Sequence, residues 1–402
     1  MRLWDRRETL DARVLSYTAG EDHRLDERLV AYDVRASAAH AEMLHAQGLL
    51  SPDDLDALRA ALREIGAEHA AGGWAIALEE EDCHTAIENR LVARVGEAGK
   101  RIHLGRSRND QVLAALRLYL IDALSVLAAA AEGVADALDG VAAHEGELPM
   151  PGYTHLQRAM PTTVGLWALG FASELRDDAE GLRAATRRAR RNPLGSGAGY
   201  GIPGVVVDRH FTTQRLGFAE THHPVTAVQL SRGKAEAGAL FETALLAQDL
   251  GRLAADLCLF ATAEFGFVRL PAAFTTGSSM LPQKRNPDLF ELARGRSGEA
   301  TAALFELLAI TAKMTSGYHR DYQLMKAPLF RGLDSALETA DLLAHALPGI
   351  RFVPETLAAA LDSSLLAAEQ ANRLVAEQGL PFREAYRRVK AALAEGETRS
   401  LP

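Results

Sequence analysis

Apolar residues recur every three or four positions through the middle of the chain, a spacing that places them on one face of an α-helix. Over 111–147 the recurring residues are Leu113, Leu116, Leu120, Leu124, Leu127, Ala131, Val134 and Leu138. We therefore predict a long helix over this range. The same periodicity predicts long helices over 162–190, about 230–265 and about 287–311.

The length of these helices constrains how the chain can pack. A helix of thirty residues is about 45 Å long, so its apolar face needs partner helices along its whole length. The pattern therefore predicts a bundle of long helices that associates with other copies of the chain. The second helix follows Pro161, and Thr162 or Thr163 can cap it with a hydroxyl oxygen.

The regions on either side of the long helices contain shorter periodic segments. Residues before 106 predict short amphipathic helices, including one over 52–64 that Ser51 caps. Near the C-terminus, Gly379 and Pro381 separate two more short helices. Shorter helices therefore flank the central bundle.

Composition agrees with a helical fold. The 402 residues are 48% hydrophobic, 24% charged and only 6% aromatic, which suits a large, mainly helical core with more than one domain. The predicted fold class is mainly α. We predict an N-terminal helical domain at 1–105, a central long-helix domain at 106–349 and a short C-terminal helical domain at 350–402.

Charge and cysteine content narrow the class of protein. The formal charge of −9 disfavours nucleic-acid and membrane partners. Two cysteines cannot form a disulfide framework, and residues 1–10 carry too many charges for a signal sequence. The longest apolar stretch, 113–138, is interrupted by Arg117, Asp122, Glu132 and Asp136. We expect a cytoplasmic protein without a membrane span.

A loop over 277–287, with the sequence GSSMLPQKRNP, has the chemistry of an anion site. Gly277 and the serines leave backbone N–H groups accessible, while Lys284 and Asn286 supply a cation and an amide. Pro287 can start a helix whose positive end faces the same place. The alternative is a surface loop with a solvated lysine.

Four other polar segments lie near the ends of predicted helices. They are EEDCHTAIENR at 80–90, GRSRNDQ at 105–111, MPGYTHLQR at 150–158 and GYHRDYQLMK at 317–326. The second could simply cap a helix through Asn109 or Asp110. Asp82 and His84 suggest a metal pair, but no further ligands follow at suitable spacing, so we expect no metal. Since Rossmann and P-loop motifs are absent from the sequence, we also expect no cofactor.

The 277–287 loop resembles the signature of the fumarase/aspartase lyase superfamily, Gly-Ser-Ser-x-Met-Pro-x-Lys-x-Asn-Pro, although Met280 and Leu281 stand where the usual order is a variable residue and then Met. The 105–111 segment resembles the argininosuccinate lyase branch, as does nearly the whole chain. The resemblance implies a fumarase/aspartase-like fold with a central helical bundle, a homotetramer, and active sites shared between subunits.

The resemblance also implies catalytic roles. Ser278 corresponds to the general base, with Ser279 as the neighbouring alternative. His155 corresponds to the acid, directly or through water, and Glu291 to the carboxylate that orients it. Lys284 stabilises the serine alkoxide and the aci-carboxylate intermediate. On residues alone, a lone histidine such as His155 is usually structural, but here it lies in a Pro/Gly-bounded turn.

Substrate contacts follow from the same resemblance. The resemblance implies that Ser107, Arg108 and Asn109 bind the end of the substrate that becomes fumarate. Further substrate contacts are implied for five residues: His84, Thr85, Thr154, Gln157 and Asn286. Tyr318, Gln323 and Lys326 are implied to bind the amino-acid end of the substrate.

The activity implied is elimination of argininosuccinate to arginine and fumarate, a step of arginine biosynthesis. Two alternatives are another fumarate-releasing lyase, of the adenylosuccinate lyase, aspartase or fumarase type, and a catalytically silent structural homologue. The 105–111 segment disfavours the first, and retention of the catalytic set disfavours the second. The sequence departs from the family pattern at Met160, His319, 18–22 and 195–207, which puts individual substrate contacts in question.

Overall fold

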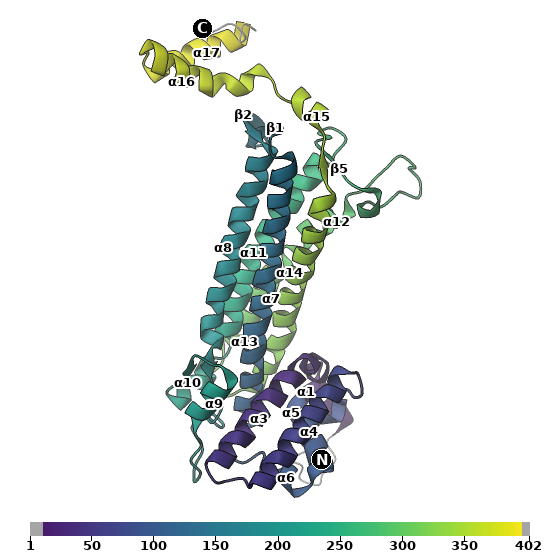
Figure 1. Cartoon of the computed structure of the whole chain (residues 1–402), viewed down its shortest axis with the longest axis vertical. Helices are drawn as coiled ribbons and strands as arrows, with labels where there is room; N and C mark the ends of the chain where they lie inside the picture. The colour runs from purple at the N-terminus through teal and green to yellow at the C-terminus, as the bar shows by residue number, and fades with distance from the viewer. Residues whose placement is uncertain (1–10, 396–402) are drawn as a thin grey trace. The chain divides into compact units, whose positions relative to one another are not determined.

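The computed structural model describes residues 11–395 and is mainly α-helical (Figure 1). The chain forms two compact units. Unit 1 comprises residues up to Ala128, Glu180–Ala244 and Glu299–Ser335, and unit 2 comprises Ala129–Ala179, Leu245–Gly298 and the residues from Ala336 on. The three-domain division expected from the sequence stays a prediction.

Four long helices have residues in both units. They are α7 (Arg108–Glu145), α8 (Val164–Ala189), α11 (Lys234–Phe260) and α14 (Lys326–Ala346). Unit 1 also contains α1 (Ala12–Ala19), α2 (Asp22–Leu25), η1 (Asp26–Leu29), α3 (Val30–Ala46), α4 (Pro52–Ala70), η2 (Leu78–Glu80), α5 (Cys83–Val95), α6 (Glu97–Arg101), β3 (Arg191–Asn192), α9 (Arg209–Leu216), β4 (Glu220–Thr221), α10 (Val225–Leu230), α13 (Glu299–Thr311) and η4 (Arg320–Met325). Unit 2 also contains β1 (Pro149–Thr154), β2 (Gln157–Thr163), β5 (Val268–Arg269), η3 (Ala272–Phe274), α12 (Asp288–Arg296), η5 (Leu347–Gly349), β6 (Arg351–Phe352), α15 (Pro354–Ala359), η6 (Ser363–Leu366), α16 (Ala367–Gln378) and α17 (Phe382–Glu395).

The predicted long helices are present, with two corrections. Helix α7 matches the first prediction, and α8 begins after Thr163, whose hydroxyl accepts a hydrogen bond from the Leu166 N–H at 3.1 Å. The helix expected over 230–265 starts only at residue 234, because the chain turns at Gly233 with φ +84°. The helix expected over 287–311 is interrupted between α12 and α13.

Unit 1 is packed tightly where its helices approach one another. Gly332 of α14 lies so close to α11 that an added Cβ would be 2.6 Å from the Leu240 side chain and 3.2 Å from Ala303 of α13. The rings of Tyr119 on α7 and Phe330 on α14 meet edge to face, with centroids 5.0 Å apart. Small residues and aromatic pairs therefore set the helix spacing in this unit.

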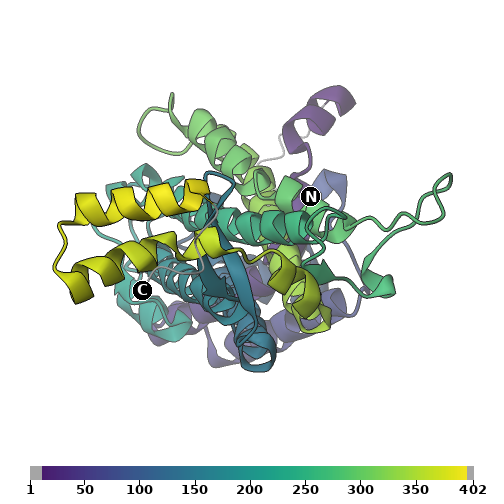
Figure 2. The same ribbon diagram turned by 90° about the horizontal axis from the view of Figure 1, so that it is seen from above.

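Unit 2 is held by contacts between α8 and its neighbours. The indole of Trp167 on α8 donates to Asp256 of α11 at 2.9 Å and packs against Phe260. The segment between β5 and α12 leaves these helices as an extended loop (Figure 1). Helices α16 and α17, drawn in yellow, lie side by side around their own small apolar cluster (Figure 2), and they break at Gly379 and Pro381 as predicted.

Helix α7 is long and apolar enough to span a bilayer by length and composition alone, so the charges at 117–136 do not by themselves exclude a span. However, 61% of its most apolar window is buried inside the protein. Burial of that kind is typical of the core helix of a bundle.

Candidate functional site

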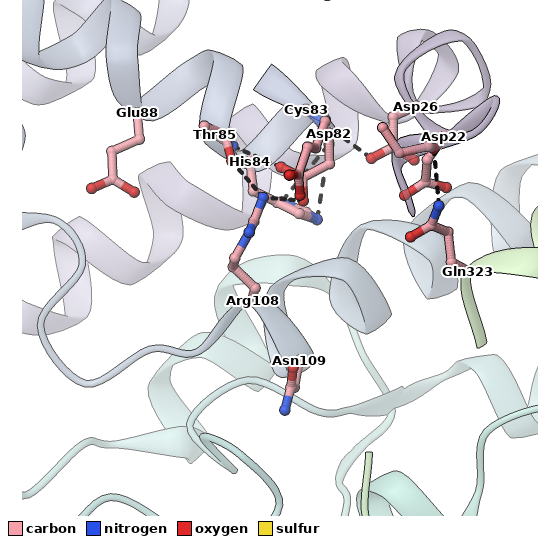
Figure 3. A network of polar contacts seen from close by, with 12 residues as sticks. Asp22, Asp26, Asp82, Cys83, His84, Thr85, Glu88, Arg108, Asn109 and Gln323 are labelled. Carbon is pink, nitrogen blue, oxygen red and sulfur yellow. Dashed lines mark hydrogen bonds and ion pairs between the residues drawn. The ribbon is translucent and has the colours of Figure 1, made fainter. Parts of the chain in front are cut away.

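Unit 1 contains a small, strongly charged pocket at the start of α7. Its volume is about 150 Å³. The lining residues are Asp22, Asp26, Glu81, Asp82, His84, Arg108, Asn109, Val112, Arg232, Tyr318, Arg320, Gln323 and Lys326. Figure 3 shows part of this set, with Arg108 reaching from α7 toward Asp82 and Thr85. Both signs of charge therefore meet in one confined space.

A buried ion cluster forms one wall of the pocket. The Lys326 ammonium binds Asp22 at 2.8 Å and also Asp26, and the three residues are almost inaccessible to water. Burial raises the pKa of Asp22 to about 7, against the opposing effect of Lys326. Burial alone would lower the pKa of Lys326, but the carboxylates of Asp26 and Asp22 outweigh it and raise that pKa. Lys326 therefore stays protonated and places a positive charge in the wall of the pocket.

Arg108 is held on the opposite side by α5. Its Nη2 donates to Asp82 at 2.6 Å and to the Thr85 hydroxyl at 2.5 Å. Burial opposes ionisation of Asp82, but His84 and Arg108 outweigh it and lower its pKa. The guanidinium is therefore oriented before any ligand enters, and Thr85 serves as one of the groups that orient it.

The 105–111 segment is also a helix cap, in which Asp110 takes part as expected but Ser107 is the N-cap. Ser107 Oγ accepts from the Asn109 N–H at 3.3 Å, and Asp110 accepts from the Ser107 N–H at 3.0 Å. Ser107 is therefore the N-cap of α7, with its hydroxyl bound to the second residue of the helix, and the Asp110 carboxylate binds the Ser107 N–H in return. Asp110 also accepts from the Gly197 N–H at 2.8 Å. Capping and pocket lining coexist, since Arg108 and Asn109 still line the pocket.

The side chain of His84 is buried and pairs with a carboxylate. Its Nδ1 lies 3.1 Å from Asp33, and both side chains are nearly inaccessible. Burial acts to lower the pKa of His84, but Asp33 outweighs it and the pKa is raised. Ligand atoms of Asp26, Cys83 and His84 lie within 4.8 Å of one another. Asp26 already binds Lys326, so a metal ion there would have to displace an ammonium group.

The 317–326 segment meets the N-terminal segment at the pocket. Gln323 Nε2 donates to the carbonyls of Thr18 at 3.1 Å and Ala19 at 3.0 Å. Arg320 donates to Thr18 O at 2.9 Å and lies 3.3 Å from Glu81. The 18–22 departure from the family pattern is thus built into the pocket, because its backbone holds two of the lining side chains.

His155 lies at the tip of the β1–β2 hairpin of unit 2. Thr154 pairs with Gln157, which leaves His155 and Leu156 as a two-residue turn with φ +54° and +58°. Positive φ at both turn positions is the geometry of a type I′ hairpin, usually formed by Asn and Gly. The sequence of these residues does not favour the turn, and strain of this kind often accompanies function. The three polar side chains, Thr154, His155 and Gln157, are exposed.

The 277–287 loop belongs to unit 2 and folds locally around Ser278. The Ser278 hydroxyl oxygen accepts from the N–H of Met280 at 3.3 Å and of Leu281 at 3.1 Å. Thr276 and Asn286 exchange backbone hydrogen bonds of 3.2 and 2.9 Å, which closes the base of the loop. The hydroxyl oxygen therefore faces two backbone donors of its own loop, and the role of the loop as an anion site stays a prediction.

A wide hollow of about 870 Å³ lies beside this loop within unit 2. Lys284, Asn286 and Glu291 line it. Glu291 has Arg294 as an ion-pair neighbour at 4.0 Å; in the described part of the chain no contact joins it to His155. Ser278, His155, Thr154 and Gln157 are not among the lining residues.

The predicted site residues thus fall into two groups. In unit 1, His84, Arg108, Asn109, Tyr318, Gln323 and Lys326 line the charged pocket, with Ser107 and Thr85 beside it. In unit 2, the hairpin and the loop carry Ser278, His155, Lys284, Glu291, Thr154, Gln157 and Asn286. Sequence reasoning missed six charged lining residues: Asp22, Asp26, Glu81, Asp82, Arg232 and Arg320. Asp22 and Asp26 are spaced by four, but nothing in the sequence indicated their burial.

The arrangement of long helices, with a glycine- and serine-rich loop and a polar hairpin, is that of a fumarase/aspartase-type lyase. A family profile described as Lyase matches residues 8–301. Among solved structures, a variant of EDDS lyase with bound fumarate has a TM-score of 0.80 at 23% identity, covering 96% of this chain and 78% of the other. A class II fumarase from Schistosoma mansoni has a TM-score of 0.80 at 17% identity, covering 95% and 89%.

Sequence comparison places the chain more narrowly. Argininosuccinate lyase from Sorangium cellulosum is 48% identical over 394 residues, covering 98% of this chain and 91% of the relative. Argininosuccinate lyase from Xanthomonas oryzae pv. oryzae is 42% identical, covering 97% and 89%. The chain belongs to the argininosuccinate lyase family of the fumarase/aspartase superfamily, a family of carbon–nitrogen lyases.

Proposed function

We propose that this protein cleaves argininosuccinate into arginine and fumarate without a cofactor, as a cytoplasmic homotetramer with active sites shared between subunits. The family relationship over nearly the whole chain supports the reaction. The structural observation that carries the mechanism is the pair of N–H groups directed at the Ser278 hydroxyl oxygen.

Ser278 acts as the general base. A serine hydroxyl is a weak acid, so its alkoxide needs positive or hydrogen-bonding groups around it. The N–H groups of Met280 and Leu281 supply two such donors, and Lys284 lies six residues further along the same loop. The alkoxide removes the proton from the carbon next to a carboxylate of the succinyl group, and the electron pair moves into that carboxylate.

Lys284 and Asn286 then stabilise the aci-carboxylate that forms. Both side chains line the hollow of unit 2, where a cation and an amide donor can face one anionic group. Collapse of this intermediate forms the carbon–carbon double bond of fumarate and breaks the carbon–nitrogen bond. Groups that bind the intermediate more strongly than the substrate lower the barrier.

His155 supplies the proton that the leaving nitrogen needs, directly or through water. The hairpin tip presents its ring to solvent, so it can approach a bound substrate without rearranging a core. Glu291 orients the ring in this mechanism. The side chains of Thr154 and Gln157 flank the turn and bind the substrate from the same hairpin.

The unit 1 pocket binds the two ends of the substrate. Ser107, Arg108 and Asn109 take the carboxylates of the fumarate end, with Arg108 oriented by Asp82 and Thr85. Tyr318, Gln323 and Lys326 take the amino-acid end. The mixture of acids and bases lining the pocket suits a ligand that carries both an ammonium and carboxylates.

Exposed apolar side chains support association of subunits. Large apolar residues remain uncovered along the long helices and their neighbours: Leu166, Leu169, Phe241, Leu245, Leu292, Phe305, Leu308 and Leu342. Exposed apolar side chains that gather into a patch mark protein interfaces. In the tetramer, Ser107, His155 and Ser278 of one active site come from different subunits.

A substrate panel tests the proposal. The purified protein is mixed with argininosuccinate, adenylosuccinate, aspartate or malate, and fumarate is followed by its ultraviolet absorbance. We expect fumarate from argininosuccinate alone, and far slower release when Ser278→Ala replaces the wild type. Fumarate from a different substrate would assign the protein to a sister activity, and no fumarate from any would identify a silent homologue.

A further inference from the structure

Arg158 joins the hairpin that carries His155 to the C-terminal part of unit 2. Its Nη1 donates to the carbonyl oxygen of Ala360 at 2.9 Å and to the carboxylate of Asp362 at 2.8 Å. These acceptors lie 202 and 204 positions further along the chain. This contact, the Arg158–Asp362 latch, therefore connects β2 to the segment between α15 and η6, and the mechanism described above does not use it.

Both strands of the hairpin lie against the same C-terminal segment. Helix α15 contacts β1, and η6 contacts β2. The segment is itself attached to the turn that follows α11, because the Thr356 hydroxyl donates to the Gly266 carbonyl at 2.7 Å and the Val353 N–H donates to the Phe267 carbonyl at 2.9 Å. The latch therefore has a fixed partner on its C-terminal side.

The carboxylate of Asp362 is oriented by its own helix start. Asp362 is the N-cap of η6, and its Oδ1 accepts from the N–H of Ser364 at 2.8 Å and also from the Ser364 hydroxyl. Its other oxygen, Oδ2, accepts from Arg158. Hydrogen bonds from Ser364 lower the pKa of Asp362, so the carboxylate is ionised at neutral pH. One oxygen caps the helix and the other holds the latch.

The latch lies directly below the turn that contains His155. Arg158 is paired with Tyr153 across the hairpin, and the ring of Tyr153 meets that of Phe265 edge to face, with centroids 5.8 Å apart. The hairpin is thus held on both strands just before its two-residue turn. Because His155 has a φ of +54° that its sequence does not favour, contacts at the base of the turn are needed to fix its direction.

We propose that the Arg158–Asp362 latch sets the position of His155, so that Arg158 and Asp362 are positioning residues for the elimination. This inference rests on the proposed function, in which His155 supplies the proton to the leaving nitrogen. Displacing a reacting group by about 1 Å can cost about a hundredfold in rate. The two residues act through the hairpin and take no part in proton transfer.

The alternative is an ordinary surface ion pair. The side chains of Arg158 and Asp362 are 46% and 48% exposed, and exposed pairs contribute little to stability. The chain offers a matched control in the pair of Arg373 and Glu369, which has the same 2.8 Å separation and similar exposure but lies within the single helix α16. A rate effect at Arg158 that is absent at Arg373 separates the two explanations.

The first measurement is the kcat for argininosuccinate in the wild type, Arg158→Lys, Arg158→Gln, Asp362→Asn and Arg373→Gln, alongside each melting temperature. We expect Arg158→Gln to lower kcat about ten- to a hundredfold, while the melting temperature changes by less than about 2 °C. Arg158→Lys keeps the charge and should recover part of this loss. Asp362→Asn keeps an oxygen that can cap η6, so its loss of kcat reports the latch alone. Arg373→Gln should stay within about twofold of the wild type.

The second measurement separates positioning of His155 from a general structural role. A general acid contributes about a hundred- to ten-thousandfold, so His155→Asn keeps a slow turnover that is followed at high enzyme concentration and saturating substrate. If Arg158 acts only through His155, adding Arg158→Gln to this variant should lower kcat by less than about twofold. A structural role would give the same fall in both backgrounds.

Three results would overturn the inference. They are a wild-type kcat in Arg158→Gln, an equal fall in the Arg373→Gln control, and a fall that persists in full when His155 is already replaced. Failure of the proposed function would show separately, as a wild type that releases no fumarate from argininosuccinate.

Discussion

The charged pocket of unit 1 and the 277–287 loop of unit 2 represent opposite ways of presenting polar groups. In the pocket, Lys326, Asp22 and Asp26 are buried and bound to one another. In the loop, Lys284 is exposed, and its side chain has no ion pair within the described part of the chain. The Lys326 cluster is therefore held by the fold before any ligand binds, whereas the side chain of Lys284 has no ion-pair partner among the described residues of its own loop.

The difference matters because each arrangement has its own energetic limits. A buried cluster is oriented in advance, and losing one member leaves the others uncompensated. An exposed loop contributes little to stability, so it can change conformation and close over a substrate. We infer that unit 1 provides a rigid binding surface and that unit 2 provides the mobile reacting groups.

Replacing Ser278 should have the largest effect on turnover. In Ser278→Ala we expect kcat to fall by about a hundred- to ten-thousandfold, because the general base is lost. The melting temperature should stay close to that of the wild type, since the half-buried hydroxyl contacts only its own loop. Ser279→Ala is the control and should be much milder. Near-normal turnover in Ser278→Ala would refute the assignment.

Mixing two inactive variants tests whether the reacting groups of unit 2 come from different subunits. The purified His155→Asn and Ser278→Ala proteins are combined under conditions in which subunits dissociate reversibly. Random hybrids should regain up to about a quarter of wild-type activity, because about that fraction of sites would receive both intact residues. Mass spectrometry would establish subunit exchange. Exchange without any recovered activity would contradict a shared site.

Paired lysine substitutions test the contrast between the two regions directly. Lys326→Met removes the cation between Asp22 and Asp26, and we expect it to cost about 3 to 5 kcal/mol of unfolding free energy. Lys284→Met should lower turnover strongly, though less than Ser278→Ala does, but leave the melting temperature nearly unchanged. Calorimetry of both variants provides the comparison.

The pH dependence of the Lys326→Met variant sharpens this test. Lowering the pH should reduce the difference from the wild type, because protonating Asp22 removes uncompensated charge, and burial already raises the pKa of that group to about 7. Equal melting temperatures for the two lysine variants at neutral pH would show that the buried cluster is not a structural element.

His222 gives the smallest predicted effect, on acid stability. Its Nδ1 accepts from Arg117 at 3.1 Å, so the ring must stay neutral. Burial, followed by Arg117, lowers the pKa of His222 to about 3. This folded-state pKa lies below the unfolded value. The stabilisation that the neutral His222 ring gives the folded protein is therefore present above about pH 6.5 and is lost as pH falls toward 3.

In His222→Asn, the amide oxygen can replace the acceptor without titrating. We expect the wild type to lose stability relative to this variant by at most about 1.4 kcal/mol for each pH unit below 6.5. Thermal melting of both proteins from pH 8 to pH 4.5 measures the difference. Parallel pH profiles would show that His222 does not titrate in this way.

The long helices were predictable because their signal is local. An apolar residue at every third or fourth position reports one helix face, and the 111–147 and 162–190 predictions are confirmed by α7 and α8. Their interruptions were not predicted. Gly233 has a positive φ, but the apolar residues around it keep a helical spacing, so the turn there was not expected. The break between α12 and α13 also lies within a helical apolar pattern.

Motif spacing identified the loop and the hairpin as polar segments, and by resemblance it supplied candidate roles for Ser278 and His155. The β-hairpin itself was missed, because the residues at its turn are poor type I′ formers. The roles stay predictions. What the structure adds is the local geometry, in which two backbone N–H groups face the Ser278 oxygen.

The sequence by itself determined the mainly helical class, the positions of α7 and α8 and the chemical types gathered in each polar segment, whereas the long helix α14 was not predicted. Only the tertiary structure decided which charges are buried and paired. Asp26 and Lys326 are 300 positions apart in the chain yet bind each other. Arg232 and Tyr318 are also distant in the sequence, and the guanidinium carbon lies 5.8 Å from the centroid of the tyrosine ring. Local periodicity carries no information about such contacts, because burial and charge pairing arise when distant segments exclude water together.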